Sequence, residues 1–194
     1  MDFSAMPTVR NFKKAWKREE SKLSVKSPMK SKLSYDDMIT HTTCATGRTD
    51  VKAAIRLGYA CLARISELLG LFWEDVSVTG EAVRIFLRGS KTDPFRRGSY
   101  LVLSFEEWLV VLGILRIRAG SLPRSGKMFP LLTRAAVAAV LGQTHSIRRG
   151  GAQRLFDVGF SLEVIKRRGR WASDAWKCYI DCSARDLLLL SDVA

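Results

Sequence analysis

The chain has 194 residues, of which 47% are hydrophobic, and this composition favours a globular domain over a disordered segment. Its 32 Lys and Arg outnumber 19 Asp and Glu, giving a formal net charge of +13. Because basic side chains that neutralise phosphates release counterions, a polyanionic partner is expected, with nucleic acid ahead of an anionic membrane surface. The sequence contains no apolar run of membrane-spanning length and no signal peptide, so we expect an intracellular protein without a membrane partner.

The four cysteines show no Cys-x-x-Cys spacing, and only His41 and His145 could join them as ligands. This spacing does not match a structural zinc site. We therefore expect reduced thiols and no metal.

Residues 1–34 hold nine Lys and Arg against three acids, with little apolar periodicity and a tract rich in Ser and Lys. Such a segment is typical of a basic arm or linker. It is either the remnant of a further domain or a solvated tail.

Residues 49–76 repeat apolar side chains at helical spacing, which predicts one long amphipathic helix with Asp50 as its N-cap. Arg64 would lie on the surface of this helix at the margin of the apolar stripe. From this segment alone, Arg64 is either an exposed partner of Glu67 or a guanidinium that emerges at a cleft.

Residues 75–78, 82–89 and 99–105 alternate or run apolar, which predicts three short antiparallel strands with a hairpin turn between the first two. The second connection is longer, polar and basic, and it contains Lys91. A lysine in such a loop is either solvated or able to carry its ammonium to a bound phosphate backbone.

Helical patterns return after the strands. Residues 105–120 predict a helix that stops at Gly120, residues 121–130 predict a loop, and Thr133 is the candidate N-cap of the next helix. Four short helices fit the remainder, with boundaries at Gly159, Ser161, Gly169 and Ser173. The expected fold is mainly α with a small three-stranded antiparallel sheet, an α+β architecture.

Residues 145–180 carry eight Lys and Arg against three acids. His145 and Arg148 are three residues apart at the start of a predicted helix, where a forked guanidinium, an imidazole and free backbone N–H groups favour an anion. Tyr179 is either a half-buried packing residue or a nucleophile, since a phenol attacks only where cations stabilise the developing charge.

Together and in this order, these motifs resemble the tyrosine recombinase (phage integrase) family. The segments that carry the resemblance read "ARISEL", "GSKTDPFRRG", "HSIRRGGA", "GRW" and "WASDAWKCYI". The last segment is most similar to eukaryotic transposon recombinases of the DIRS and Crypton type. The catalytic residues implied by the resemblance are Arg64, Lys91, His145, Arg148, Trp171 and Tyr179, with Glu67 as the supporting acid.

The resemblance implies transesterification without metal, ATP or any other cofactor. Tyr179 would attack a scissile DNA phosphate to form a 3′-phosphotyrosyl link and release a 5′-hydroxyl. Lys91 would be the general acid, His145 the base or a phosphate ligand, and Trp171 an indole donor. Nine further basic residues would hold the DNA backbone: Arg88, Arg96, Arg97, Arg149, Arg154, Lys166, Arg167, Arg168 and Arg170.

The resemblance also implies an organisation and a partner. Residues 35–182 would form the catalytic domain, residues 1–34 the arm left from a core-binding domain, and residues 183–194 a C-terminal segment that is exchanged between neighbours or packs on its own domain. The partner would be double-stranded DNA. Four copies of the chain would assemble on two duplexes, and without DNA the protein would be a monomer or a dimer. The location would be the nucleus in a eukaryote and the cytoplasm otherwise.

Two features depart from the family pattern. Trp171 stands where a second histidine is commoner, so proton transfer would fall on His145 and Lys91. The helical domain that usually precedes the catalytic one would be represented only by the short arm. Two other readings stay open. One is a type IB topoisomerase, and the other is a catalytically silent basic DNA-binding module.

Overall fold

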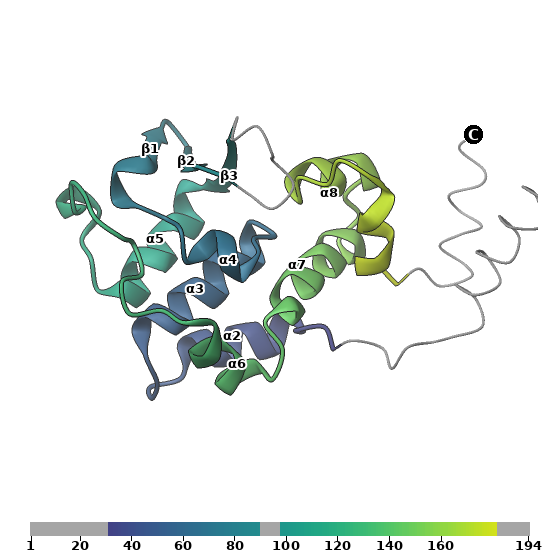
Figure 1. Ribbon diagram of the computed structural model, residues 1–194, viewed down its shortest axis with the longest axis horizontal. Helices are drawn as coiled ribbons and strands as arrows, with labels where there is room; N and C mark the ends of the chain where they lie inside the picture. The colour runs from purple at the N-terminus through teal and green to yellow at the C-terminus, as the bar shows by residue number, and fades with distance from the viewer. Residues whose placement is uncertain (1–30, 90–97, 182–194) are drawn as a thin grey trace, which may run out of the picture. The chain divides into compact units, whose positions relative to one another are not determined.

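The computed structural model describes residues 31–89 and 98–181, and this part consists of helices and one small sheet (Figure 1). The helices are α2 (Tyr35–Thr43), α3 (Thr49–Ala60), α4 (Ile65–Leu68), α5 (Phe105–Leu115), α6 (Arg134–Leu141), α7 (His145–Asp157) and α8 (Leu162–Arg168). Three short 3₁₀ segments are η2 (Trp73–Asp75), η3 (Ala119–Ser121) and η4 (Asp174–Tyr179). The predicted fold class is confirmed, whereas the helix expected near the C-terminus lies outside the described residues.

The sheet joins β1 (Val76–Thr79), β2 (Ala82–Leu87) and β3 (Ser99–Ser104) in the order β1-β2-β3, with both pairs antiparallel. Alternate residues of β2 are buried, as its period-two pattern predicts. Ser104 then caps α5 by accepting from the Glu107 backbone N–H, and α5 packs against the sheet. The predicted strands and their hairpin are confirmed.

The single long helix predicted over residues 49–76 is wrong. Helix α3 ends at Ala60, Leu62 adopts a left-handed backbone with φ 50°, and Arg64 is extended before α4 begins. The N-cap of α3 is Arg48 rather than Asp50. Apolar spacing does not reveal the break, because Leu62 and Ile65 are both buried on either side of it.

Capping residues mark several other boundaries. The side chains of Thr133, Ser161 and Ser173 each accept a backbone hydrogen bond at the start of α6, α8 and η4, as predicted. Helix α5 stops earlier than predicted, at Arg116 with φ 58° rather than at Gly120. No element was predicted for α2, which Ser34 caps.

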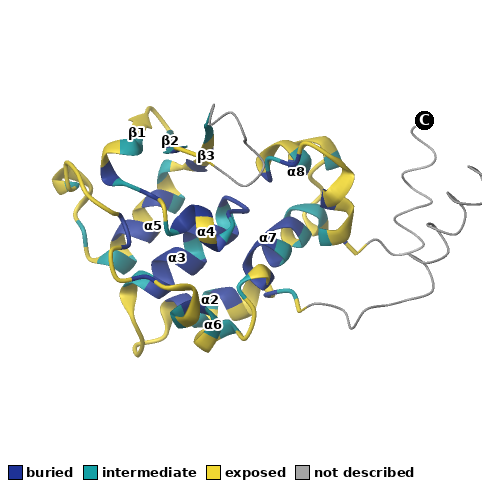
Figure 2. Ribbon diagram, viewed as in Figure 1, coloured by how far each residue is buried: buried dark blue, intermediate teal, exposed yellow. Residues whose placement is uncertain are grey.

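Helix α3 is central and contacts α2, α5, α6 and α7 (Figure 1). Most of its residues are buried in the main apolar core, as Figure 2 shows. A second, smaller apolar cluster joins the α3–α4 break to α7, α8 and η4, and its members are Leu62, Ala152, Ile165, Trp171, Trp176 and Ile180. This second cluster holds the last described segment against α7.

Helix α7 approaches its neighbours closely at two adjacent glycines. A Cβ added to Gly150 would overlap the backbone carbonyl of Leu33, and one added to Gly151 would overlap that of Tyr59. Since backbone atoms cannot swing aside as a flexible side chain can, these positions require glycine. The close approach sets the distance between α7 and α3.

We predict that Gly150→Ala lowers the free energy of unfolding by about 2 kcal/mol, because the methyl group forces α7 away from Leu33. The matched control is Gly113→Ala in α5, where no heavy atom lies within 4 Å of the added Cβ. That control should stabilise the fold by about 0.5–1 kcal/mol, since alanine favours a helix. Urea unfolding measures both, and equal shifts in the two variants would contradict the packing argument.

Candidate active site

Six of the predicted catalytic and supporting residues come together from two distant parts of the chain. Arg64 and Glu67 lie at the α3–α4 break and on α4, while the other four lie on α7, on η4 and between α8 and η4. Those four are His145, Arg148, Trp171 and Tyr179. Lys91, Arg96 and Arg97 lie outside the described residues.

Arg64 is held by Glu67 at the start of α4. Its backbone N–H donates to Glu67 Oε2 at 2.8 Å, and its Nη1 donates to Glu67 Oε1, also at 2.8 Å. The expectation that Arg64 lies on a helix surface is wrong, because it is the extended N-cap residue. The predicted pairing with Glu67 is present, in the form of a buried capping interaction.

Glu67 also bonds a second guanidinium. Arg170 Nη2 donates to Glu67 Oε2 at 2.8 Å, and the Glu67 side chain is only 2% exposed. Burial acts to raise the pKa of Glu67, but the charge of Arg170 and the hydrogen bonds from Arg64 outweigh it, so that the pKa lies below 4.5. The carboxylate is therefore ionised at neutral pH. Sequence reasoning had placed Arg170 among the DNA-backbone contacts and missed this link.

Arg148 is an almost completely buried cation, with 1% of its surface exposed. Its Nη2 donates to the carbonyl oxygen of Gly169, and its guanidinium carbon lies 4.4 Å from the Trp171 ring centroid. Within the described residues, Nε and Nη1 have no hydrogen-bond partner. A buried charge with two unused donors is costly unless an anion binds it.

Burial and, next, the positive charge of Arg64 lower the pKa of Arg148 to about 10. Arg148 is therefore still cationic at neutral pH, although its charge is destabilised. An incoming anion would relieve this repulsion between the two guanidinium groups.

Tyr179 ends η4 and is bordered by cations and an imidazole. Its hydroxyl lies 3.3 Å from His145 Nε2, within hydrogen-bond distance. The guanidinium carbons of Arg148 and Arg149 lie 5.6 Å and 5.5 Å from its ring centroid. Negative charge that develops on this phenol would be stabilised by its surroundings.

Trp171 packs against both Arg148 and Tyr179. It is 7% exposed, and its ring centroid lies 5.0 Å from that of Tyr179. A Cβ on Gly169 would overlap the indole ring, so glycine is needed two residues before the tryptophan. The indole thus sets the spacing of the arginine and the phenol.

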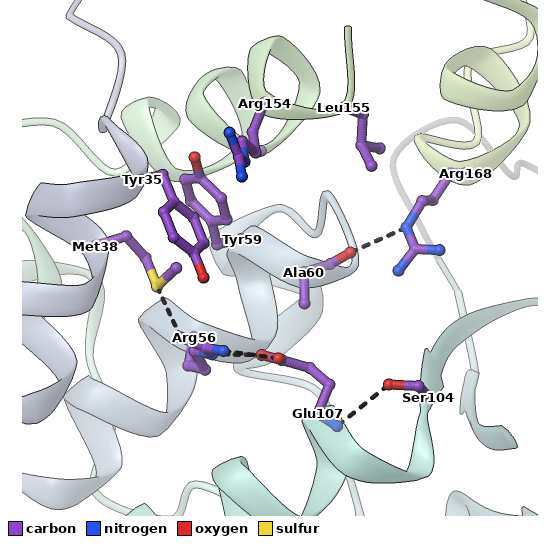
Figure 3. Close-up of a pocket in the computed structure, with 11 residues that line it drawn as sticks. Tyr35, Met38, Arg56, Tyr59, Ala60, Ser104, Glu107, Arg154, Leu155 and Arg168 are labelled. Atoms are coloured by element: carbon purple, nitrogen blue, oxygen red, sulfur yellow. Dashed lines mark hydrogen bonds and ion pairs between the residues drawn. The ribbon is translucent and has the colours of Figure 1, made fainter. Parts of the chain in front are cut away.

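Five of the basic residues named from the sequence make contacts away from the six converging residues: Arg88, Arg154, Lys166, Arg167 and Arg168. Arg88 pairs with Glu74 and Asp75, Arg167 with Glu163, and Lys166 with Asp174. Arg154 and Arg168 line an open pocket of about 330 Å³ beside Tyr35, as Figure 3 shows. Arg168 Nε donates there to the carbonyl of Ala60, and none of the six converging residues lines the pocket.

Over residues 31–89 and 98–181, no group of three or more His, Cys, Asp or Glu side chains is placed to hold a metal ion. In the same ranges, none of the helices combines the length and apolar character needed to cross a membrane.

Comparison with solved structures identifies the fold. The XerH site-specific recombinase in its post-cleavage complex with palindromic difH superposes with a TM-score of 0.61 at 14% identity, over 87% of this chain and 54% of that one. XerA recombinase matches with a TM-score of 0.59 at 17% identity, covering 85% and 65% of the two chains. The Tn1549 transposon integrase bound to circular intermediate DNA matches with a TM-score of 0.55 at 14% identity, covering 86% and 66%.

These likenesses show that the chain has the tyrosine recombinase catalytic-domain fold. The chain spans little more than half the length of the XerH chain that it matches. No family model matches the sequence, and no curated protein does.

We predict that Glu67→Gln lowers the free energy of unfolding by about 3 kcal/mol at neutral pH, because two guanidinium groups lose their carboxylate. Since the folded pKa of Glu67 lies below 4.5, its contribution is complete above that pH and is lost as the pH falls through the folded value. The difference between wild type and variant should therefore shrink in acid. Urea unfolding between neutral pH and about pH 3 measures it, and a constant difference would contradict the assignment.

Proposed function

We propose that the chain is the catalytic domain of a site-specific DNA recombinase that cleaves and rejoins strands through a 3′-phosphotyrosyl intermediate. One observation carries the proposal. The Tyr179 hydroxyl lies within hydrogen-bond distance of His145, next to a buried Arg148 that keeps two donors without partners in the described residues. The similarity of this chain's fold to those of XerH, XerA and the Tn1549 integrase supports the proposal.

In the proposed reaction, Tyr179 Oη forms a bond to the scissile phosphorus while the bond from phosphorus to the 5′-oxygen breaks. His145 takes the phenolic proton or holds a nonbridging oxygen, because its Nε2 is the ring nitrogen that faces the hydroxyl. Arg64 and Arg148 stabilise the charge on the nonbridging oxygens. Lys91 is assigned by resemblance as the acid that protonates the leaving 5′-oxygen.

The proposed partner is double-stranded DNA. The net charge of +13 supports a polyanion, and the matching structures include XerH bound to its difH substrate and the Tn1549 integrase in complex with circular intermediate DNA. A tetramer on two duplexes is proposed for the assembled state. The segment "WASDAWKCYI", which contains Tyr179, favours a member of the DIRS or Crypton type within this fold.

We predict that Tyr179→Phe abolishes covalent attachment to DNA and leaves DNA affinity within about twofold, because the ring still packs on Trp171 while the nucleophilic oxygen is gone. A nicked suicide duplex followed by denaturing electrophoresis measures the attachment. A covalent band in the variant would refute Tyr179 as the nucleophile.

A second substitution tests the guanidinium. Arg148→Lys should slow single-turnover attachment by on the order of a hundredfold, because an ammonium cannot present paired donors to the phosphate. Circular dichroism and urea unfolding of the variant serve as the folding control. Wild-type attachment in a folded Arg148→Lys protein would rule out the clamp role.

The same substrates separate the other readings. Relaxation of supercoiled plasmid without exchange between two sites would favour a type IB topoisomerase. DNA binding with no covalent band in the wild type would favour a silent binding module.

A further inference from the structure

The side chain of Arg170 is turned inward, although it lies in the most basic part of the chain. It is 13% exposed. Its Nη2 donates to Glu67 Oε2 at 2.8 Å and to the Leu62 carbonyl at 3.4 Å. Its Nη1 donates to the carbonyls of Cys61 and Arg168, each at 3.1 Å. Both hydrogens on each terminal nitrogen thus meet acceptors from the protein itself, which leaves them unavailable to a phosphate.

Three of these acceptors belong to the α3–α4 break and the short helix that follows it. The carbonyls of Cys61 and Leu62 are left unpaired by the end of α3, and Arg170 supplies their donors. The carboxylate of Glu67 is the group that holds Arg64. Arg170 therefore bonds the same carboxylate that holds Arg64, and it shares Oε2 with the Arg64 backbone N–H.

The backbone of Arg170 explains how the side chain reaches this break. Its φ of 57° is left-handed, a conformation that a residue with a long side chain adopts only when its surroundings hold it there. The two neighbours serve the other half of the site. Gly169 offers its carbonyl to Arg148, and Trp171 stacks on the same guanidinium. Of these three consecutive residues, Gly169 and Trp171 contact Arg148, and Arg170 contacts Glu67, which holds Arg64.

We propose that Arg170 is a positioning residue that fixes Glu67, and through it Arg64, relative to Arg148 and Tyr179, and that it is not a DNA-backbone contact. The inference rests on the function proposed above. Preorganised donors act on a transition state only if they are held within a fraction of an ångström. Without Arg170, the α3–α4 break keeps its apolar contacts to Trp171 but it and α4 lose three hydrogen bonds to this segment, and Glu67 is left with Arg64 alone.

The first test separates rate from affinity. Arg170→Gln should slow single-turnover attachment at saturating DNA by on the order of ten- to a hundredfold, with DNA affinity and its salt dependence unchanged. Arg170→Lys should recover part of the rate, because it restores a charge beside Glu67 but not all the carbonyl contacts. The control is Arg134→Gln on the exposed surface of α6, which should match wild type.

A DNA-backbone contact at Arg170 would give a different result in the same assay. A backbone contact would give weaker binding and a salt slope smaller by about one, with a wild-type rate once DNA saturates the protein. That outcome would overturn the positioning role.

The second test is a double-mutant cycle with Glu67→Gln. If Arg170 acts through Glu67, the double variant should attach DNA no more slowly than the slower single variant. Losses that multiply would show that the two residues act separately and would overturn the proposal. Urea unfolding of all four proteins should show the same coupling without DNA. This keeps the test decisive if Arg170→Gln alone is unstable, because the double variant has no buried carboxylate that has lost one of its two cations.

Failure of the proposed function looks different. If the wild type forms no covalent band on any nicked duplex, the recombinase assignment fails and the positioning role fails with it. If the wild type forms the band and the losses multiply, only the role of Arg170 is wrong.

Discussion

A buried carboxylate between two arginines is the interaction on which the arrangement of the site depends. Glu67 is 2% exposed and accepts from Arg64 and Arg170, which lie more than a hundred residues apart in sequence. Burying one charge of this kind is unfavourable unless partners surround it, so its two cations have little freedom to separate. The pairing therefore joins the α3–α4 break to the loop between α8 and η4, and it brings Arg64 and Arg148 close enough for each to oppose the other's charge.

The phenol is placed by apolar packing rather than by a regular helix. Tyr179 is the last residue of a short 3₁₀ segment, and it packs against the cluster formed by Trp171, Trp176 and their neighbours. Isolated 3₁₀ turns are weakly stable, so the position of the hydroxyl relies on these indole contacts. The same tryptophan stacks on Arg148, so one indole ring packs against both the phenol and the guanidinium.

The sequence predicts this structure well where the signal is local. Alternating or continuous apolar residues predicted the strands, and the burial pattern of β2 agrees. The hydroxyl side chains of Thr133, Ser161 and Ser173 predicted where α6, α8 and η4 begin. The α3–α4 break was missed because Leu62 is buried in the second cluster, so the apolar repeat continues across it. The ordered motifs identified residues that do converge, but Arg170 resembles any other arginine in a basic run. Its role depends on a left-handed backbone that no local pattern indicates.

Helix α7 lies close against Leu33, near the first residues that the structure describes, and this contact has a mechanical consequence. Leu33 donates its backbone N–H to Ser146 at 3.1 Å, next to the glycine that admits its carbonyl, and Lys32 bonds both Gln153 of α7 and Asp181. Lys32 and Leu33 are thus bonded to the helix that bears His145 and Arg148, and Lys32 is also bonded to Asp181, the last residue that the structure describes. Tension applied at Lys32 would therefore act on α7, which carries His145 and Arg148, before it reached the sheet.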